Sequence, residues 1–119
     1  MENKQANKLI DTILENIDKT GINTEVLIDD IKALRAYALE EQVPLVVKVL
    51  RYTYEHIKEN ENFLIPILND EPLGEDDVIE NESDTPAESL KYLIALTRNL
   101  KNKGNIADLI EYKELLMAY

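Results

Sequence analysis

The sequence predicts an all-α fold: a compact bundle of about five helices, with one short extended apolar segment and one long acidic loop between helices three and four. Apolar residues recur three and four positions apart along most of the chain, as they do on one face of a helix. With only three Gly and four Pro among 119 residues, the chain is poor in the turn residues that an all-β fold needs. This length suffices for one hydrophobic core, so we expect a single domain over residues 1–119.

The first predicted helix covers residues 4–19, because its isoleucines repeat at helical spacing. Gly21 is placed to end this helix, since glycine readily adopts the positive φ that closes a helix C-terminus. The second predicted helix covers residues 25–41. Its apolar stripe consists of Leu27, Ile31, Leu34 and Ala38.

The third predicted helix covers residues 44–61, and we expect the rest of the bundle to be organised around it. Pro44 disfavours helical conformation in the preceding residue and suits the first position of a new helix, so helices two and three form a tight antiparallel hairpin. The charged residues share one narrow stripe, and the remaining arc of roughly 220° exceeds the roughly 100° that a surface helix buries. This helix therefore needs at least two neighbours, with Val46, Leu50 and Ile57 as its main core residues.

The stretch after residue 61 does not continue the helical pattern. Residues 63–68 (FLIPIL) are apolar but contain Pro66, so we expect an extended segment laid over one end of the bundle. Residues 69–84 form an acidic connector with eight acidic residues and no basic one, a composition typical of a solvated loop.

The fourth predicted helix covers residues 86–103 and has the strongest local start signal in the chain. Thr85 suits the N-cap, Pro86 the first helical position and Glu88 the third, as in a capping box. Gly104 is expected to stop this helix.

The fifth predicted helix covers residues 106–118, with Asn105 as its N-cap. Its predicted apolar stripe consists of Ile106, Leu109, Ile110, Leu116 and Met117. The links between the helices are short everywhere except at the acidic connector, as in a bundle of antiparallel neighbours.

The charge balance disfavours several classes of partner. Thirteen basic and 24 acidic residues give a net charge of −11, whereas binding to nucleic acid or to an anionic membrane depends on Lys and Arg. No apolar run reaches the roughly 18 residues of a membrane span, and the first residues lack the apolar core of a signal peptide. The chain contains no cysteine, which excludes disulfides and thiolate metal sites and fits a cytoplasmic protein.

His56 is the only histidine, and we expect it to have a structural role. A general base needs an orienting carboxylate, and the neighbouring Glu55 points about 100° away on the helical wheel. His56 lies beside Tyr52 at the edge of the apolar arc, as a half-buried histidine that donates a hydrogen bond to a neighbour would. The sequence has no glycine-rich phosphate loop, no Glu-x-x-His pair and no EF-hand spacing. We therefore expect no enzymatic activity, no metal and no cofactor.

These observations favour a small helical protein-interaction module that binds another protein or itself, and a homodimer is the simplest such assembly. Self-association would cover the apolar surface that helix three, residues 63–68 and the tyrosines leave over. The candidate interaction surface consists of Tyr52, His56, Phe63, Leu64, Asp76, Asp77, Lys91 and Arg98.

Two other functions stay open. An acidic inhibitor or immunity-type protein would place the connector, with Asp76 and Asp77, in a basic groove of its partner. A metal-binding or enzymatic bundle is the third reading, and it has no supporting motif. Lys91 and Arg98 form the one notable basic patch, and we hypothesise that the chain's own acidic connector neutralises it.

Overall fold

The computed structural model describes residues 1–65 and 86–119. Within these residues the chain forms five helices and no strand, which confirms the predicted all-α bundle. The helices are α1 (Lys4–Thr20), α2 (Thr24–Glu40), α3 (Pro44–Asn60), α4 (Pro86–Leu96) and α5 (Lys103–Ala118). The predicted acidic connector 69–84, with Asp76 and Asp77, and the predicted N-cap Thr85 lie outside the described residues.

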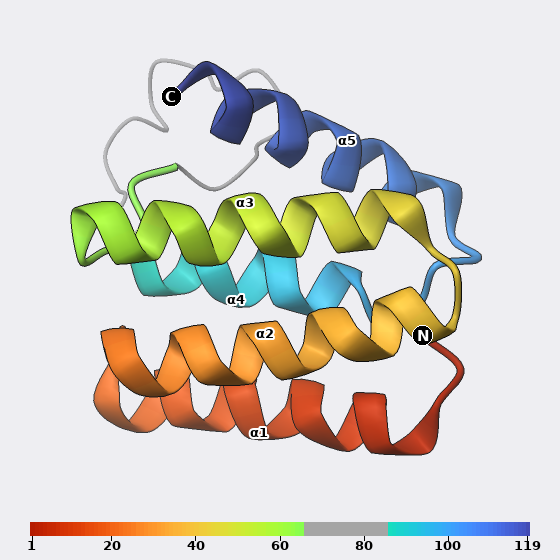
Figure 1. Cartoon of the computed structure of the whole chain (residues 1–119), viewed down its shortest axis with the longest axis horizontal. Helices are drawn as coiled ribbons and strands as arrows, with labels where there is room; N and C mark the ends of the chain where they lie inside the picture. Colours follow the sequence, from red (N-terminus) through yellow and green to blue (C-terminus); the bar gives the residue numbers. More distant parts are fainter. Residues whose placement is uncertain (66–85) are drawn as a thin grey trace, which may run out of the picture.

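The helices of the described chain pack as a closed ring, in the order α1, α2, α3, α5, α4 and back to α1. In Figure 1, α2 and α3 lie side by side, α4 lies behind α3, and α5 crosses over the top of the bundle. Each helix thus has two neighbours and buries one face of its circumference between them.

Helix α3 packs against α2 on one side and α5 on the other, so the prediction of at least two neighbours is confirmed. Val46, Leu50 and Ile57 are fully buried, as predicted. The two most extensive contacts between helices of the described chain both involve α3, in accord with its expected central place, although every other helix also has two neighbours.

The ends of the first three helices follow the local signals in the sequence. Gly21 has a φ of +72° and its N–H donates to the carbonyl of Ile17 at 2.9 Å, which closes α1. At the other end of this helix, the Asn3 side chain accepts hydrogen bonds from the second and third helical N–H groups. Pro44 is the first residue of α3, so the α2–α3 hairpin has the predicted short turn.

Helix α4 ends at Leu96, seven residues before the predicted end at residue 103. The Thr97 hydroxyl donates to the carbonyl of Ile94 at 2.7 Å. The terminal ammonium of Met1 donates to the carbonyls of Thr97 and Arg98 at 2.8 and 2.7 Å. These carbonyls therefore have a partner from the far end of the chain instead of N–H groups of a continuing helix.

Helix α5 begins at Lys103, three residues before the predicted start at residue 106. Its N-cap is Asn102 and not the predicted Asn105, because the Asn102 side chain accepts hydrogen bonds from the N–H groups of Gly104 and Asn105. Gly104 consequently lies inside the first turn of α5 and does not stop the preceding helix.

The described part of the apolar segment, residues 63–65, lies against the bundle as expected. Phe63 and Ile65 are buried, whereas Leu64 is 43% exposed. The Phe63 ring lies 6.4 Å from the ring of Tyr112 on α5 and 5.5 Å from that of His56 on α3, so it fills the space between these two helices. Among the described helices, none combines the length and the apolar character needed to cross a bilayer.

Candidate interaction surface around His56

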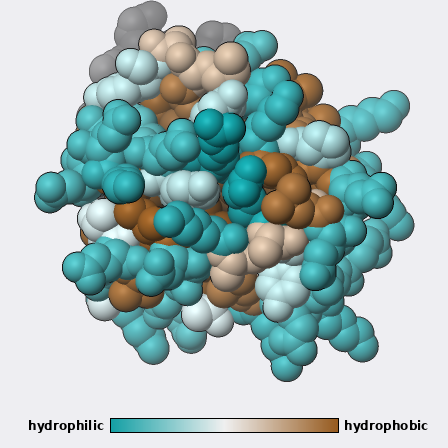
Figure 2. Space-filling view, viewed as in Figure 1, coloured by the Kyte–Doolittle hydropathy of each residue, from teal (hydrophilic) through white to brown (hydrophobic). Residues whose placement is uncertain are grey.

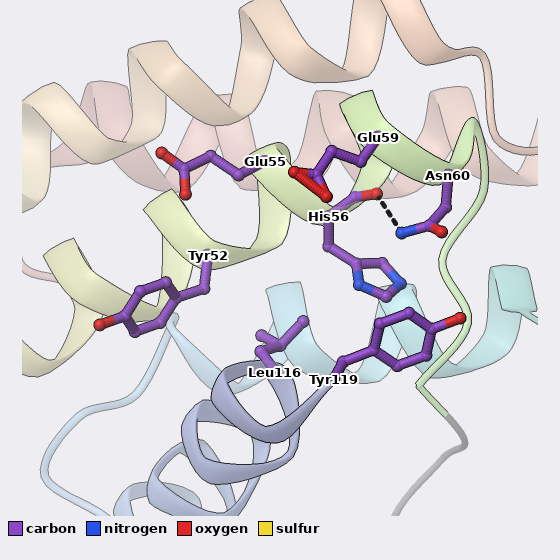
Figure 3. Close-up of a pocket in the computed structure, with 7 residues that line it drawn as sticks. All are labelled: Tyr52, Glu55, His56, Glu59, Asn60, Leu116 and Tyr119. Atoms are coloured by element: carbon purple, nitrogen blue, oxygen red, sulfur yellow. Dashed lines mark hydrogen bonds between the residues drawn. The ribbon is translucent and has the colours of Figure 1, made fainter.

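A shallow pocket of about 280 Å³ lies where the last turns of α3 meet the end of α5, and it contains two of the predicted surface residues, Tyr52 and His56. The close-up in Figure 3 shows the side chains that line it. They are Tyr52, Glu55, His56, Glu59, Asn60, Leu116 and Tyr119.

Helical spacing brings the α3 side chains to this pocket. Tyr52, His56 and Glu59 are separated by four and three positions, so they share one face of the helix. From α5, Leu116 anchors the helix in the core, and Tyr119, directly after the helix, remains 65% exposed. Figure 3 shows the imidazole of His56 directed toward Tyr119, while Tyr52 and Glu55 point away from the imidazole.

His56 connects three parts of the fold. Only 7% of the residue is exposed, and its Nε2 accepts a hydrogen bond from the N–H of Leu64 at 2.9 Å. The imidazole also meets the ring of Tyr119 edge-on, with 4.7 Å between the ring centroids. The predicted structural role fits these contacts, but Nε2 accepts a hydrogen bond where the sequence suggested that the histidine donates one.

The hydrogen bond from Leu64 assigns the neutral imidazole to the tautomer with its proton on Nδ1, because Nε2 must offer a lone pair. Burial lowers the pKa of His56 below its ordinary value of 6.5, and the nearby Glu59 carboxylate opposes this effect. The imidazole is therefore held neutral in the folded protein at physiological pH.

The end of α3 turns the chain so that it passes back over His56. Glu61 adopts a φ of +54°, and its N–H donates to the carbonyl of Ile57 at 2.7 Å. The Asn60 side chain donates to the carbonyl of His56 at 2.9 Å. These contacts end the helix and place the N–H of Leu64, eight residues after His56, in reach of the imidazole.

Three of the seven exposed large apolar residues of the described chain lie on α5. The sequence predicted the excess on helix three, on the apolar segment and on the tyrosines, and of these Leu64 and Tyr119 are exposed. Figure 2 shows apolar patches separated by hydrophilic side chains on one face of the molecule. The exposed large hydrophobic residues of the described chain are Val26, Leu39, Leu64, Ile110, Leu115, Met117 and Tyr119. None of them belongs to α3, and the predicted stripe residues Ile110 and Met117 are in fact exposed.

Lys91 and Arg98 lie apart from this pocket and pair with carboxylates of α1. The Lys91 Nζ donates to Asp18 at 2.5 Å and to Glu88 at 3.4 Å. Arg98 forms an ion pair with Asp11. The proposed neutralisation of this patch by the connector 69–84 stays a prediction, because the connector lies outside the described residues.

Phe63 is fully buried, so this member of the predicted surface forms part of the core beneath the pocket. In the described chain, no group of three His, Asp or Glu side chains is placed to hold a metal ion. Ser89 is also buried, where its hydroxyl lies against that of Tyr112. Leu64 and Tyr119 are the exposed apolar residues that contact His56.

The chain matches no family model, no curated protein and no solved structure. A functional proposal therefore depends on the exposure, contacts and charges described above.

Proposed function

We propose that this protein is a non-enzymatic helical interaction module that self-associates through α5 and the adjoining Leu64. The observation that carries the proposal is the exposure of three large apolar side chains on α5 and of a fourth directly after it, which lies between 36% and 65%. These side chains are Ile110, Leu115, Met117 and Tyr119. We call this set, together with Leu64, the α5 surface.

The α5 surface extends over both flanks of the helix. Ile110 and Met117 are seven positions apart on one flank, and Leu115 and Tyr119 are four apart on the other. Between the flanks, Leu109, Tyr112 and Leu116 anchor α5 in the core. A helix that is apolar on more than one side is typical of a helix that packs against a further element.

A second copy of the chain is the partner that the local charge favours. Helix α5 contains two basic residues, Lys103 and Lys113, and three acidic ones, Asp108, Glu111 and Glu114, which gives a local net charge of −1. The net charge of the whole chain is −11, so α5 is a place where two copies can approach with little repulsion. A twofold contact would bring the same surface together from both copies.

Sedimentation velocity on the wild-type chain and on Met117→Glu tests this proposal. We expect a dimer for the wild type and a monomer for Met117→Glu, with unchanged helical circular dichroism, because a buried carboxylate at the contact is unfavourable. The matched control is Leu39→Glu on α2, a residue that is also more than half exposed and that should leave the dimer intact. A wild-type chain that stays monomeric at the highest attainable concentration would refute self-association.

The second candidate is an acidic inhibitor that occupies a basic groove on another protein. The concentration of eight acidic residues and no basic one in residues 69–84 favours it, since complementary charge accelerates and selects binding. Replacing Asp76 and Asp77 by lysine should abolish capture of such a partner, and unchanged capture would reject this candidate. For either function we expect action in the cytoplasm, since the chain contains no cysteine.

A further inference from the structure

The segment after α3 is held by the buried side chains of Phe63 and Ile65 and by one hydrogen bond to a titratable acceptor. The N–H of Leu64 donates to Nε2 of His56, and this imidazole also lies edge-on to the rings of Phe63 and Tyr119. One buried side chain thus contacts the helix it belongs to, the segment 63–65 and the end of α5.

Protonation of His56 is incompatible with this arrangement. An imidazolium has N–H groups at both ring nitrogens and offers no acceptor. Two N–H donors would then face each other at 2.9 Å, and a charge would be placed on a residue that is only 7% exposed. Both effects are relieved when the segment 63–65 moves away and lets water reach the imidazole.

The charged groups near the imidazole do not remove this conflict. The charged groups that line the pocket with the imidazole are Glu55 and Glu59 on α3, and the neutral titratable groups there are Tyr52 and Tyr119. Glu55 already accepts a hydrogen bond from Arg51 at 3.2 Å. Glu59 is exposed to solvent and opposes the effect of burial on the pKa of His56 without outweighing it.

We propose that His56 is a pH-operated latch, whose protonation releases the segment 63–65 from α3 and loosens the attachment of Tyr119 at the end of α5. The latch consists of groups already in contact and does not require self-association. Leu64 and Tyr119 also belong to the α5 surface, so acidification would additionally weaken the dimer; this second effect rests on the proposed function.

Amide hydrogen exchange of Leu64, read by NMR, tests the latch directly. Protection of the Leu64 N–H should fall by up to about tenfold per pH unit as the pH drops from 6.5 to the lowered pKa of His56, after correction for the intrinsic pH dependence of exchange. The amide of Leu50, in the middle of α3, is the internal control and should keep its protection over about pH 7.5 to 5. Equal protection of Leu64 across this range would overturn the proposal.

A variant and a spectroscopic measurement keep the test independent of folding. His56→Gln retains an acceptor that does not titrate, so it should remove the pH dependence of Leu64 exchange. In the wild type, the ¹⁵N shifts of the His56 ring should report the Nδ1–H tautomer at neutral pH and a pKa below 6.5. A His56 that titrates at 6.5 or above, or that carries its proton on Nε2, would overturn the latch whether or not the variant folds.

Sedimentation at the two ends of this range, about pH 7.5 and about pH 5, separates this proposal from self-association. Loss of Leu64 protection with a chain that is monomeric at both pH values would support the latch and refute the dimer. A dimer at both pH values with an invariant Leu64 amide would support the dimer and refute the latch.

Discussion

The hydroxyl groups of Ser89 and Tyr112 lie 3.0 Å apart in the buried contact between α4 and α5. The Tyr112 hydroxyl donates to the backbone carbonyl of Ser89 at 3.2 Å, so the Ser89 hydroxyl is the donor in the contact between the two side chains. A polar pair buried this deeply has its hydrogen bonds satisfied within the protein and fixes how α5 is rotated on α4.

Removing the tyrosine hydroxyl should destabilise the fold more than removing the serine hydroxyl. Tyr112→Phe leaves both the hydroxyl and the carbonyl of Ser89 without this partner, and we expect a loss of about 1–3 kcal/mol in the free energy of unfolding. Ser89→Ala should lose about 1 kcal/mol or less, because Tyr112 still donates to the carbonyl. In urea denaturation, the loss of unfolding free energy in the double variant should be smaller than the sum of the losses in the two single variants. Strict additivity would contradict the coupling.

Truncation of Leu50 should be far more damaging than truncation of Leu39. Leu50 is fully buried on α3, so Leu50→Ala leaves a cavity and should lower the free energy of unfolding by about 2–5 kcal/mol. Leu39→Ala removes the same atoms from a side chain that is 53% exposed, and its effect should stay within about 0.5 kcal/mol. Urea denaturation measures both, and equal losses would contradict the burial of α3.

The N-cap of α5 can be located by two asparagine substitutions. Asn102→Ala should lower the free energy of unfolding by about 0.5–2 kcal/mol, because its side chain accepts from two N–H groups at the start of the helix. Asn105→Ala should cost less, since its side chain makes only an exposed hydrogen bond to the carbonyl of Asn99. Thermal denaturation followed by circular dichroism ranks the two, and the reverse order would favour the start that the sequence predicted.

Replacement of Asp30 by asparagine should stabilise the protein at neutral pH. Burial raises the pKa of Asp30 above its ordinary value of 3.8, Asp29 adds to this effect, and a hydrogen bond from Asn16 opposes it. The folded state holds the carboxyl proton of Asp30 more tightly than the unfolded chain does. The contribution of Asp30 to stability is therefore lost as pH rises from 3.8 through the raised pKa.

The neutral amide of Asp30→Asn avoids this loss, so its melting temperature should exceed that of the wild type at pH 7. The gain should shrink as pH falls through the raised pKa of Asp30. Asp29→Asn is the matched control, because Asp29 is exposed and its substitution should have the smaller effect. A gain for Asp30→Asn that persists unchanged in acid would contradict this assignment.

The bounds of α1, α2 and α3 could be predicted because the signals that set them are local. The φ of Gly21 and the fixed ring of Pro44 act on adjacent residues, and the helices end within a residue of the predicted positions. The end of α4 could not be predicted in this way. Leu100 continues the apolar spacing, but the carbonyls of residues 97 and 98 bond to the Met1 ammonium, a contact between positions almost one hundred residues apart.

The site was predictable only in part for the same reason. Helical spacing correctly placed Tyr52 and His56 together at the edge of the apolar arc of α3. The hydrogen bond from Leu64 depends on the positive φ of Glu61, which is not glycine and gives no sequence signal. The exposure of Met117 depends on which sides of α5 are covered by α3 and α4. The apolar pattern of α5 alone does not specify those sides.

Within the described chain, the α4–α5 pair packs between two other helices: α1 contacts α4, and α3 contacts α5. A polypeptide of residues 1–65 would therefore offer residues 86–119 two separate contact surfaces, one on α1 and one on α3. Without the other fragment, each would leave apolar helix faces exposed to water. Two such pieces, produced from separate genes, should recognise each other and rebuild the bundle. The bundle can in this sense be divided into two complementary fragments.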